Sequence, residues 1–209
     1  MSYNITPTVF SHNKKEFEER LSRLRKISKN LQIDIMDGKF VKAKSIQISQ
    51  IPNLKRYNNS FEVHLMVKKP SNYIKKLKSK GFKKIIFHFN TDDNVAVIAQ
   101  IKKAKMQAFL ALNPEDKVDN ASYLFQLVDG ILLMGHVPGK EHLGLVSSTF
   151  GKIKSIRKID KNIKIQIDGG VNAKDIRKLA KLGVNIFNTG SFVADAQNPR
   201  KALAILKKG

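Results

Sequence analysis

Apolar, strand-like runs alternate with amphipathic, helix-like segments along the whole chain of 209 residues. This alternation constrains the fold more than any other feature, because strands that are each followed by a helix form parallel sheets with helical crossovers. The strand-like runs lie at 5–9, within 32–38, and at 61–67, 84–89, 108–112, 130–134, 163–167 and 184–189. The helix-like segments lie at 13–27, 45–50, 70–80, 94–105, 118–127, 150–156, 173–182 and 199–207.

Eight such units with no long insertion between them predict an α/β fold of the closed (β/α)8 type, a TIM barrel. An open doubly wound sheet is the alternative, and the regularity of the units favours the barrel. No linker or low-complexity stretch interrupts the pattern, so we expect a single domain over residues 1–209.

The net charge of +22 comes from 39 lysines and arginines against 17 acids. Such an excess can attract nucleic acid or phosphorylated substrates. The lysines are spread over every predicted helix and are not interleaved with aromatic residues. We therefore expect a solvated basic surface that steers anionic substrates, and not a nucleic-acid interface.

The sequence contains no cysteine, which excludes disulfides and thiol chemistry. No apolar run approaches the length of a membrane span, and the first residues lead into a strand and not into a signal peptide. These features predict a soluble, cytoplasmic protein without a membrane partner.

Polar side chains gather near the ends of the predicted strands, which meet at one rim of a barrel and form its working face. They are Thr8, Asp34, Asp37, His64, His88, Asn113 and Asp168. Asp37, His88 and Asn113 could equally well cap helices or satisfy loops. Taken together, the set predicts a functional site at this rim.

The alternation of side chains along a strand gives Gln32, Asp34 and Met36 the same face. Two carboxylates, Asp34 and Asp168, and the imidazole of His64 would then converge on one cavity. Such a set suits a divalent metal such as Zn²⁺, Fe²⁺ or Mn²⁺, and it equally suits general acid–base catalysis. The residues alone leave both interpretations open.

Glycines follow the last two predicted strands, in Asp168-Gly169-Gly170 and in Gly190-Ser191, each ahead of a helix. Loops at these positions of a barrel commonly bind phosphate through backbone N–H groups and a helix N-terminus. The sequence therefore predicts a phosphate site beside the two acids.

These motifs resemble those of the ribulose-phosphate 3-epimerase family of ribulose-phosphate-binding barrels. The matching stretches, in chain order, are Pro7-Thr8, Asp34-Ile35-Met36-Asp37-Gly38, Val63-His64-Leu65-Met66-Val67, Phe87-His88, Ala111-Leu112-Asn113-Pro114, Leu133-Met134, Pro138-Gly139, Asp168-Gly169-Gly170-Val171-Asn172 and Gly190-Ser191. They cover nearly the whole chain.

The resemblance implies epimerisation at C3 of a pentulose 5-phosphate, with Asp34 and Asp168 as the acid/base pair. It implies a divalent metal (Zn, Fe, Mn or Mg) held by Asp34, His64, Asp168 and the residue at position 32. It also implies contacts to a phosphorylated ketose and a homo-oligomeric state. The implied substrate-binding residues are Thr8, Met36, Met66, Gly139, Gly169, Gly170, Gly190 and Ser191.

The chain departs from the family pattern at four places, two of which are Thr8 in place of a serine and Lys42-Ala43 in place of Pro-Asn. Gln32 stands where the family has a histidine ligand, and a glutamine carbonyl is a poorer ligand for a borderline metal. The stretch 137–143 lacks two glycines and a glutamine of the family's substrate-covering loop, although Lys140 could meet the phosphate directly. His136 or His142 could replace the missing ligand, but both belong to this loop, and we expect them at its surface. The departures fit either a divergent epimerase or a phosphosugar-binding paralogue that no longer catalyses.

Overall fold

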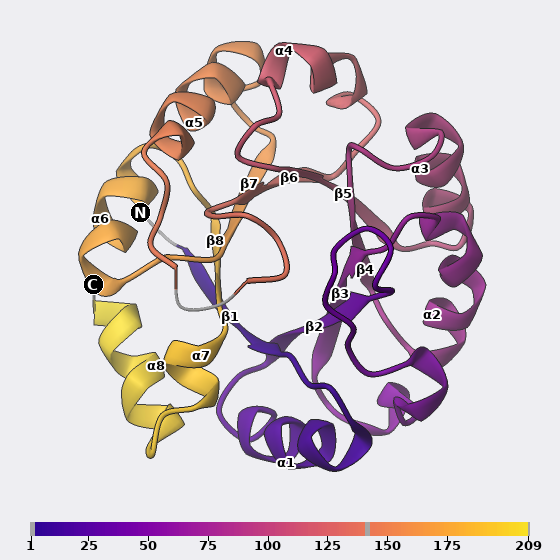
Figure 1. The fold of residues 1–209 in the computed structure, drawn as a ribbon. Helices are drawn as coiled ribbons and strands as arrows, with labels where there is room; N and C mark the ends of the chain where they lie inside the picture. The colour runs from indigo at the N-terminus through magenta and orange to yellow at the C-terminus, as the bar shows by residue number, and fades with distance from the viewer. Residues whose placement is uncertain (1–2, 141–142, 209) are drawn as a thin grey trace.

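The computed structural model describes residues 3–140 and 143–208. Within them, eight parallel strands close into a barrel in chain order, with β1 paired to β8, so the predicted TIM barrel is confirmed (Figure 1). The strands are β1 (Asn4–Val9), β2 (Asn30–Met36), β3 (Ser60–Met66), β4 (Lys84–His88), β5 (Gln107–Leu112), β6 (Gly130–Met134), β7 (Lys164–Asp168) and β8 (Ile186–Thr189).

Helices surround the barrel as an outer ring (Figure 1). They are α1 (Lys14–Leu24), α2 (Ile74–Lys80), α3 (Asn94–Lys103), α4 (Val118–Ala121), α5 (Ser148–Ile159), α6 (Ala173–Lys181), α7 (Ser191–Ala194) and α8 (Pro199–Lys208). Short 3₁₀ turns complete the ring: η1 (Ile48–Gln50), η2 (Leu54–Arg56), η3 (Pro70–Tyr73) and η4 (Ser122–Leu124).

Helical structure forms in each predicted segment, but several segments are shorter than the pattern suggested. Helix α1 ends at Leu24 and not at Ile27, and α3 ends at Lys103 and not at Lys105. Only η1 forms in the stretch 45–50, and α4 with η4 ends at Leu124 and not at Leu127. The short helix α7, directly after β8, was not predicted, because four residues give no measurable periodicity.

Local signals place the helix ends where the sequence suggests. Asn13 caps α1 by accepting a hydrogen bond from the backbone N–H of Glu16 at 3.0 Å. Gly81 ends α2 in the left-handed conformation, at φ +103°, which a residue with a side chain rarely adopts. These caps fix where the chain turns back into the barrel.

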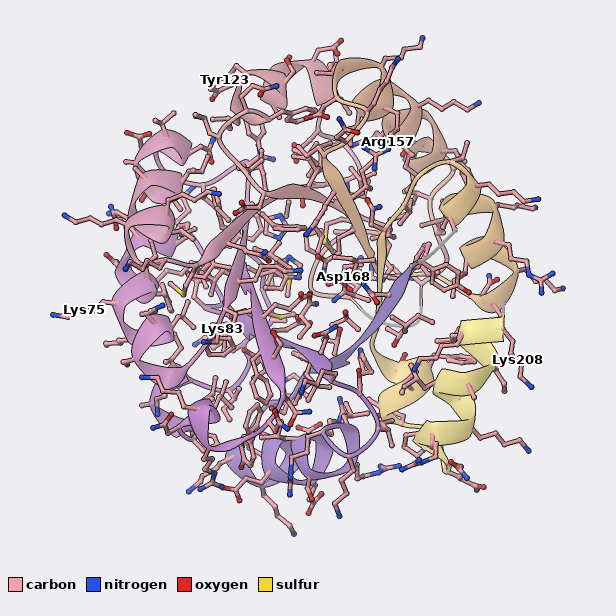
Figure 2. All side chains as sticks on the ribbon, turned by 180° about the vertical axis from the view of Figure 1, so that it is seen from behind. Lys75, Lys83, Tyr123, Arg157, Asp168 and Lys208 are labelled. Atoms are coloured by element: carbon pink, nitrogen blue, oxygen red, sulfur yellow. The ribbon has the colours of Figure 1, made fainter. Side chains whose placement is uncertain are left out.

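The main apolar core lies between the barrel and the helices and contains the outward residues of β2: Leu31, Ile33 and Ile35. The inward residues Gln32 and Asp34 are buried inside the barrel, as the alternation predicts. Among residues 3–140 and 143–208, no helix is long and apolar enough to cross a membrane. Basic side chains such as Lys75 and Lys208 point outward at the edge of the molecule, whereas Asp168 lies near its centre (Figure 2).

Candidate active site

A cavity of about 580 Å³ opens at the carboxyl-terminal ends of the strands. Its lining includes the two predicted acids, the predicted imidazole and every predicted substrate-binding residue. These are Thr8, Asp34, Met36, His64, Met66, Gly139, Asp168, Gly169, Gly170, Gly190 and Ser191. The structure therefore brings the predicted residues together in one place, while their individual roles stay predictions.

The strand register explains how the two acids and the imidazole meet. Asp34 on β2 pairs with His64 on β3, and Asp168 ends β7. His64 Nδ1 lies 3.1 Å from Asp168 Oδ2 and 3.8 Å from Asp34 Oδ1. One ligand atom from each residue lies within 4.8 Å of the others. Two carboxylate oxygens and one imidazole nitrogen at this spacing form a donor set that fits a divalent cation.

Gln32 lies below the cavity and presents its amide nitrogen to both acids. Its Nε2 lies 2.7 Å from Asp168 Oδ2 and 3.0 Å from Asp34 Oδ1. Its Oε1, the atom through which an amide would bind a metal, instead accepts a hydrogen bond from Asn188 Nδ2 at 2.6 Å. In this arrangement Gln32 is a hydrogen-bond donor to the acids, in contrast to the ligand role that the resemblance implies.

The pKa values of His64 and Asp168 are both shifted in the direction that favours the charged form of each group. Burial opposes a charge on His64, but the hydrogen bond and negative charge of Asp168 outweigh it and raise the pKa of His64. Burial likewise opposes ionisation of Asp168, yet His64 and the hydrogen bond from Gln32 lower the pKa of that carboxyl. Both pKa shifts share a cause, the attraction between the Asp168 carboxylate and the His64 imidazole.

His88 supports His64 from the side away from the acids. The two rings stack at 5.0 Å, and their Nε2 atoms lie 2.9 Å apart. Burial and the neighbouring His64 hold the pKa of His88 well below its usual value. A neutral His88 can accept a hydrogen bond from His64 Nε2, which leaves His64 Nδ1 directed at the acids. His88 thus orients the site without lining it.

Asp37 has a structural role, one of the two alternatives for this residue. Its carboxylate accepts hydrogen bonds from the backbone N–H groups of Lys39, Phe40 and Lys68 at 2.8–2.9 Å. Burial opposes its ionisation, but these donors prevail and lower the pKa of Asp37. The residue closes the loop after β2 and lies outside the acid pair.

The loop after β6 reaches the mouth of the cavity, where Lys140 and Leu143 line it. The expectation that His136 lies at the surface is wrong: the residue is 8% exposed, and its Nε2 would lie 2.5 Å from a Cβ placed on Gly169. His136 is held inward because its Nδ1 lies 3.0 Å from the carbonyl oxygen of Val137. His142 lies outside the described residues.

Backbone geometry at the other side of the mouth requires glycine. Gly170 has φ +71°, and a Cβ there would lie 2.5 Å from the backbone nitrogen of Leu145. Gly190 is the N-cap residue of α7, and Ser191 is the first residue of the helix. The chain is thereby free to bring backbone N–H groups close to a ligand at this wall.

Comparison with known proteins shows to which family the chain belongs. The model of the ribulose-phosphate 3 epimerase family matches residues 4–194. The chain belongs to this family. It is 25% identical over 209 residues to the ribulose-phosphate 3-epimerase of Schizosaccharomyces pombe, covering 97% of this chain and 92% of the relative. It is 32% identical over 170 residues to that of Buchnera aphidicola subsp. Schizaphis graminum, covering 78% and 75%.

Solved structures with low sequence identity to this chain share its fold. KGPDC from Streptococcus mutans superposes with a TM-score of 0.75 at 12% identity, covering 99% of this chain and 96% of its own. A 3-hexulose-6-phosphate synthase gives 0.73 at 14% identity, covering 98% of each chain. At these identities the likeness shows the fold alone.

Sequence reasoning missed Asn188, which lines the cavity and binds Gln32. A signal was present, because polar residues recur on the inward faces of four strands where apolar ones would be expected. They are Glu62, Lys84, Gln166 and Asn188. The site predicted from the sequence draws its polar residues only from the carboxyl-terminal ends of the strands, and these four residues lie elsewhere in their strands.

Proposed function

We propose that this protein is a ribulose-phosphate 3-epimerase that interconverts ribulose 5-phosphate and xylulose 5-phosphate. The observation that carries the proposal is the convergence of Asp34 and Asp168, from β2 and β7, on one cavity beside His64. Family membership supports it, since the relatives named above are ribulose-phosphate 3-epimerases.

The two acids divide the reaction between the two faces of the sugar carbon. One carboxylate removes the proton from C3, and the electron pair of the C–H bond moves to form an enediolate with the neighbouring carbonyl. The other acid, in its protonated form, then delivers a proton to C3 on the opposite face. Two acids on separate strands suit this task, because a single group would return the proton to the face from which it came.

Asp34, His64 and Asp168 are the residues that would hold a divalent cation. A bound cation would supply positive charge to the enediolate oxygens and to the acid pair. Zn²⁺, Fe²⁺, Mn²⁺ and Mg²⁺ are the candidates. His64 would contribute Nδ1, since its Nε2 faces His88.

The remaining lining suits the rest of the substrate. Met36, Met66 and Met134 line the cavity, and their apolar side chains keep water from the reacting carbons. Gly169, Gly170, Gly190 and Ser191 would bind the phosphate through backbone N–H groups, with Lys140 adding positive charge. Thr8, which also lines the cavity, would contact a sugar hydroxyl.

The test is an assay of the purified protein with each cation and ribulose 5-phosphate. We expect xylulose 5-phosphate to form and deuterium from solvent to enter C3. Asp34→Asn and Asp168→Asn should remove both signals. The absence of turnover with all four cations would contradict the proposed activity.

A second candidate is a phosphosugar-binding protein without catalysis, and the position of Gln32 favours it. An amide N–H bound to both acids occupies lone pairs that proton transfer requires. This candidate predicts that ribulose 5-phosphate raises the melting temperature while C3 takes up no deuterium. Uptake of deuterium would exclude it.

Three further expectations accompany the function. The relative in Oryza sativa subsp. japonica, 28% identical over 211 residues, is a cytoplasmic isoform, which supports a cytoplasmic location here. A homo-oligomeric state and the lack of a nucleic-acid partner stay predictions. Light scattering tests the first, and a gel shift at low salt tests the second.

A further inference from the structure

The interior of the barrel below the acid pair is filled by a chain of hydrogen-bonded polar side chains. Glu62, Lys84, Gln166, Asn188 and Gln32 are each buried, with exposures between 0% and 8%. The chain starts at the ion pair between Lys84 Nζ and Glu62 Oε2, 2.5 Å apart, and ends at the site. Every link between these ends is an amide, which can be turned in either of two ways.

Lys84 determines the orientation of the first amide. Its ammonium group has donors and no acceptor, so the atom of Gln166 that it contacts at 3.1 Å must be the oxygen Oε1. Gln166 Nε2 therefore points the other way, and it donates to Glu62 Oε1 and Asn188 Oδ1, each at 2.5 Å. Lys84 as the donor and Glu62 as the acceptor thus select the same orientation of the Gln166 amide.

The same logic continues to the site. Because Asn188 Oδ1 accepts from Gln166, its Nδ2 must donate, and it donates to Gln32 Oε1 at 2.6 Å. Gln32 Nε2 is then left to face Asp34 and Asp168. Ionised carboxylates only accept hydrogen bonds, so the upper end of the chain selects the same direction as the lower end.

From this directed chain we infer that Gln32 is a positioning residue that holds the two acids through its amide nitrogen, and that Lys84 sets its orientation from the opposite end of the barrel. This inference deepens the proposed function, because it concerns the same acid pair. The cation site then has three protein ligands, Asp34, His64 and Asp168, and a cation must compete with the Gln32 N–H groups for the acids.

A charge swap at the base of the barrel tests the inference without changing the net charge. In Glu62→Lys/Lys84→Glu the donor and the acceptor at the base of the barrel change places, so Gln166 and Asn188 turn over and Asn188 Oδ1 faces Gln32. The two acids and Asn188 then compete for the Gln32 N–H groups, and a cation bound to the acids resolves the competition, because Gln32 can donate to Asn188 and turn its carbonyl oxygen toward the cation as a fourth ligand. We expect Mn²⁺, measured by calorimetry and electron paramagnetic resonance, to bind at least about tenfold more tightly. An unchanged or weaker Mn²⁺ affinity in the folded variant would overturn the inference.

A matched control swaps the surface pair Lys102 and Asp129, whose side chains are 40% and 32% exposed. Lys102→Asp/Asp129→Lys makes the same charge exchange outside the barrel and should leave Mn²⁺ affinity within about twofold of the parent. An equal tightening there would show that the effect comes from charge exchange alone and would also refute the inference.

Gln32→Met gives a test that does not depend on the double variant folding. It keeps the approximate volume of the side chain and removes both amide atoms. If the nitrogen restrains the acids, Mn²⁺ affinity stays equal or rises severalfold; if the oxygen is a ligand, affinity falls by about tenfold or more. Only the first result agrees with the inference.

The metal-free protein gives a readout independent of metal and of activity. In ¹⁵N-labelled protein, the side-chain amide protons of Gln32 should exchange far more slowly than those of the exposed Gln100 and should shift in Asp168→Asn. Exchange as fast as that of Gln100 would contradict the inference. Loss of epimerase turnover alone would sink the proposed function and leave these results in place.

Discussion

At the amino-terminal end of the strands, the barrel interior holds an acid and a base in contact, Glu62 and Lys84. At the carboxyl-terminal end it holds two acids, Asp34 and Asp168, around the imidazole of His64. Both ends place charge in a buried interior, where an uncompensated charge is costly. The lower end carries its own cation, whereas the upper end relies on His64 and the N–H groups of Gln32.

The two ends of the barrel differ in what their buried charges contribute, stability at the lower end and function at the upper end. A lysine beside an acid neutralises it permanently and leaves no acceptor for a substrate proton. An imidazole and an amide compensate the acids only in part, so a divalent cation and a proton can still be accepted there. The lower half is built to be satisfied by the chain itself, and the upper half is built to be completed by a ligand.

The largest expected effect comes from removing a charge at the upper end. Asp168→Asn should lower kcat of the proposed reaction by about 10²–10⁴-fold, because one face of the sugar loses its proton carrier. Stability of the metal-free protein at neutral pH should fall as well, because the substitution removes the buried carboxylate that pairs with His64 and accepts from Gln32 Nε2. A coupled assay and thermal unfolding measure the two quantities. A variant that retains parental kcat would show that the acid pair is not the catalytic machinery.

The second effect comes from breaking the compensation at the lower end. Lys84→Met leaves Glu62 buried without its cation and should cost about 3–5 kcal/mol in the free energy of unfolding. Lys84→Met/Glu62→Gln should recover most of this loss, because the amide introduced by the second substitution keeps an acceptor for Gln166 while the charge is gone. Urea denaturation measures both. Equal loss in the single and double variants would show that packing, and not charge, dominates at this end.

The sequence predicts the upper half of the barrel well and the lower half poorly, for a physical reason. Asp34, His64 and Asp168 lie at or near strand ends, and the closed barrel alone brings such ends to one rim. Gln166 and Asn188 lie within strands, where only three-dimensional register decides which neighbours they meet. The direction of an amide depends on the whole chain of partners, and no local pattern contains it.

The loop after β6 shows a second limit of the sequence. Loop composition suggests that His136 is exposed, yet the ring packs against Gly169 of the neighbouring loop. The close approach is allowed because Gly169, at φ +94°, has no side chain. A contact between two loops depends on the strand ends that carry them, so the barrel must be known first.

An intermediate effect is expected where the upper half meets this loop. Gly170→Ala would place a Cβ 2.5 Å from the backbone nitrogen of Leu145, at a φ of +71° that alanine rarely adopts. We expect KM for the sugar phosphate to rise about tenfold while kcat falls less, because the phosphate wall moves and the acids stay in place. Gly151→Ala, where a Cβ meets nothing within 4 Å, is the matched control and should leave both constants unchanged. A similar rise in KM for both variants would contradict this account.

The smallest effect concerns Asp37, the third acid of the upper half, which is satisfied by backbone N–H groups and needs no cation. Its folded-state pKa is lowered below the ordinary value of 3.8, so its contribution to stability is present above pH 3.8 and is lost as the pH falls through the lowered pKa. Asp37→Asn should therefore cost about 1 kcal/mol at pH 7, an amount limited by solvent screening. The difference from the parent should vanish in strong acid.

Urea unfolding of the parent and Asp37→Asn, from pH 7 downward, measures this difference. If the difference in unfolding free energy persists below the lowered pKa of Asp37, the cause is a steric disturbance of the loop by the amide and not the loss of charge. The same substitution should leave Mn²⁺ affinity unchanged, because Asp37 lies outside the group of Asp34, His64 and Asp168. That result would separate an acid satisfied by the backbone from the pair that awaits a cation.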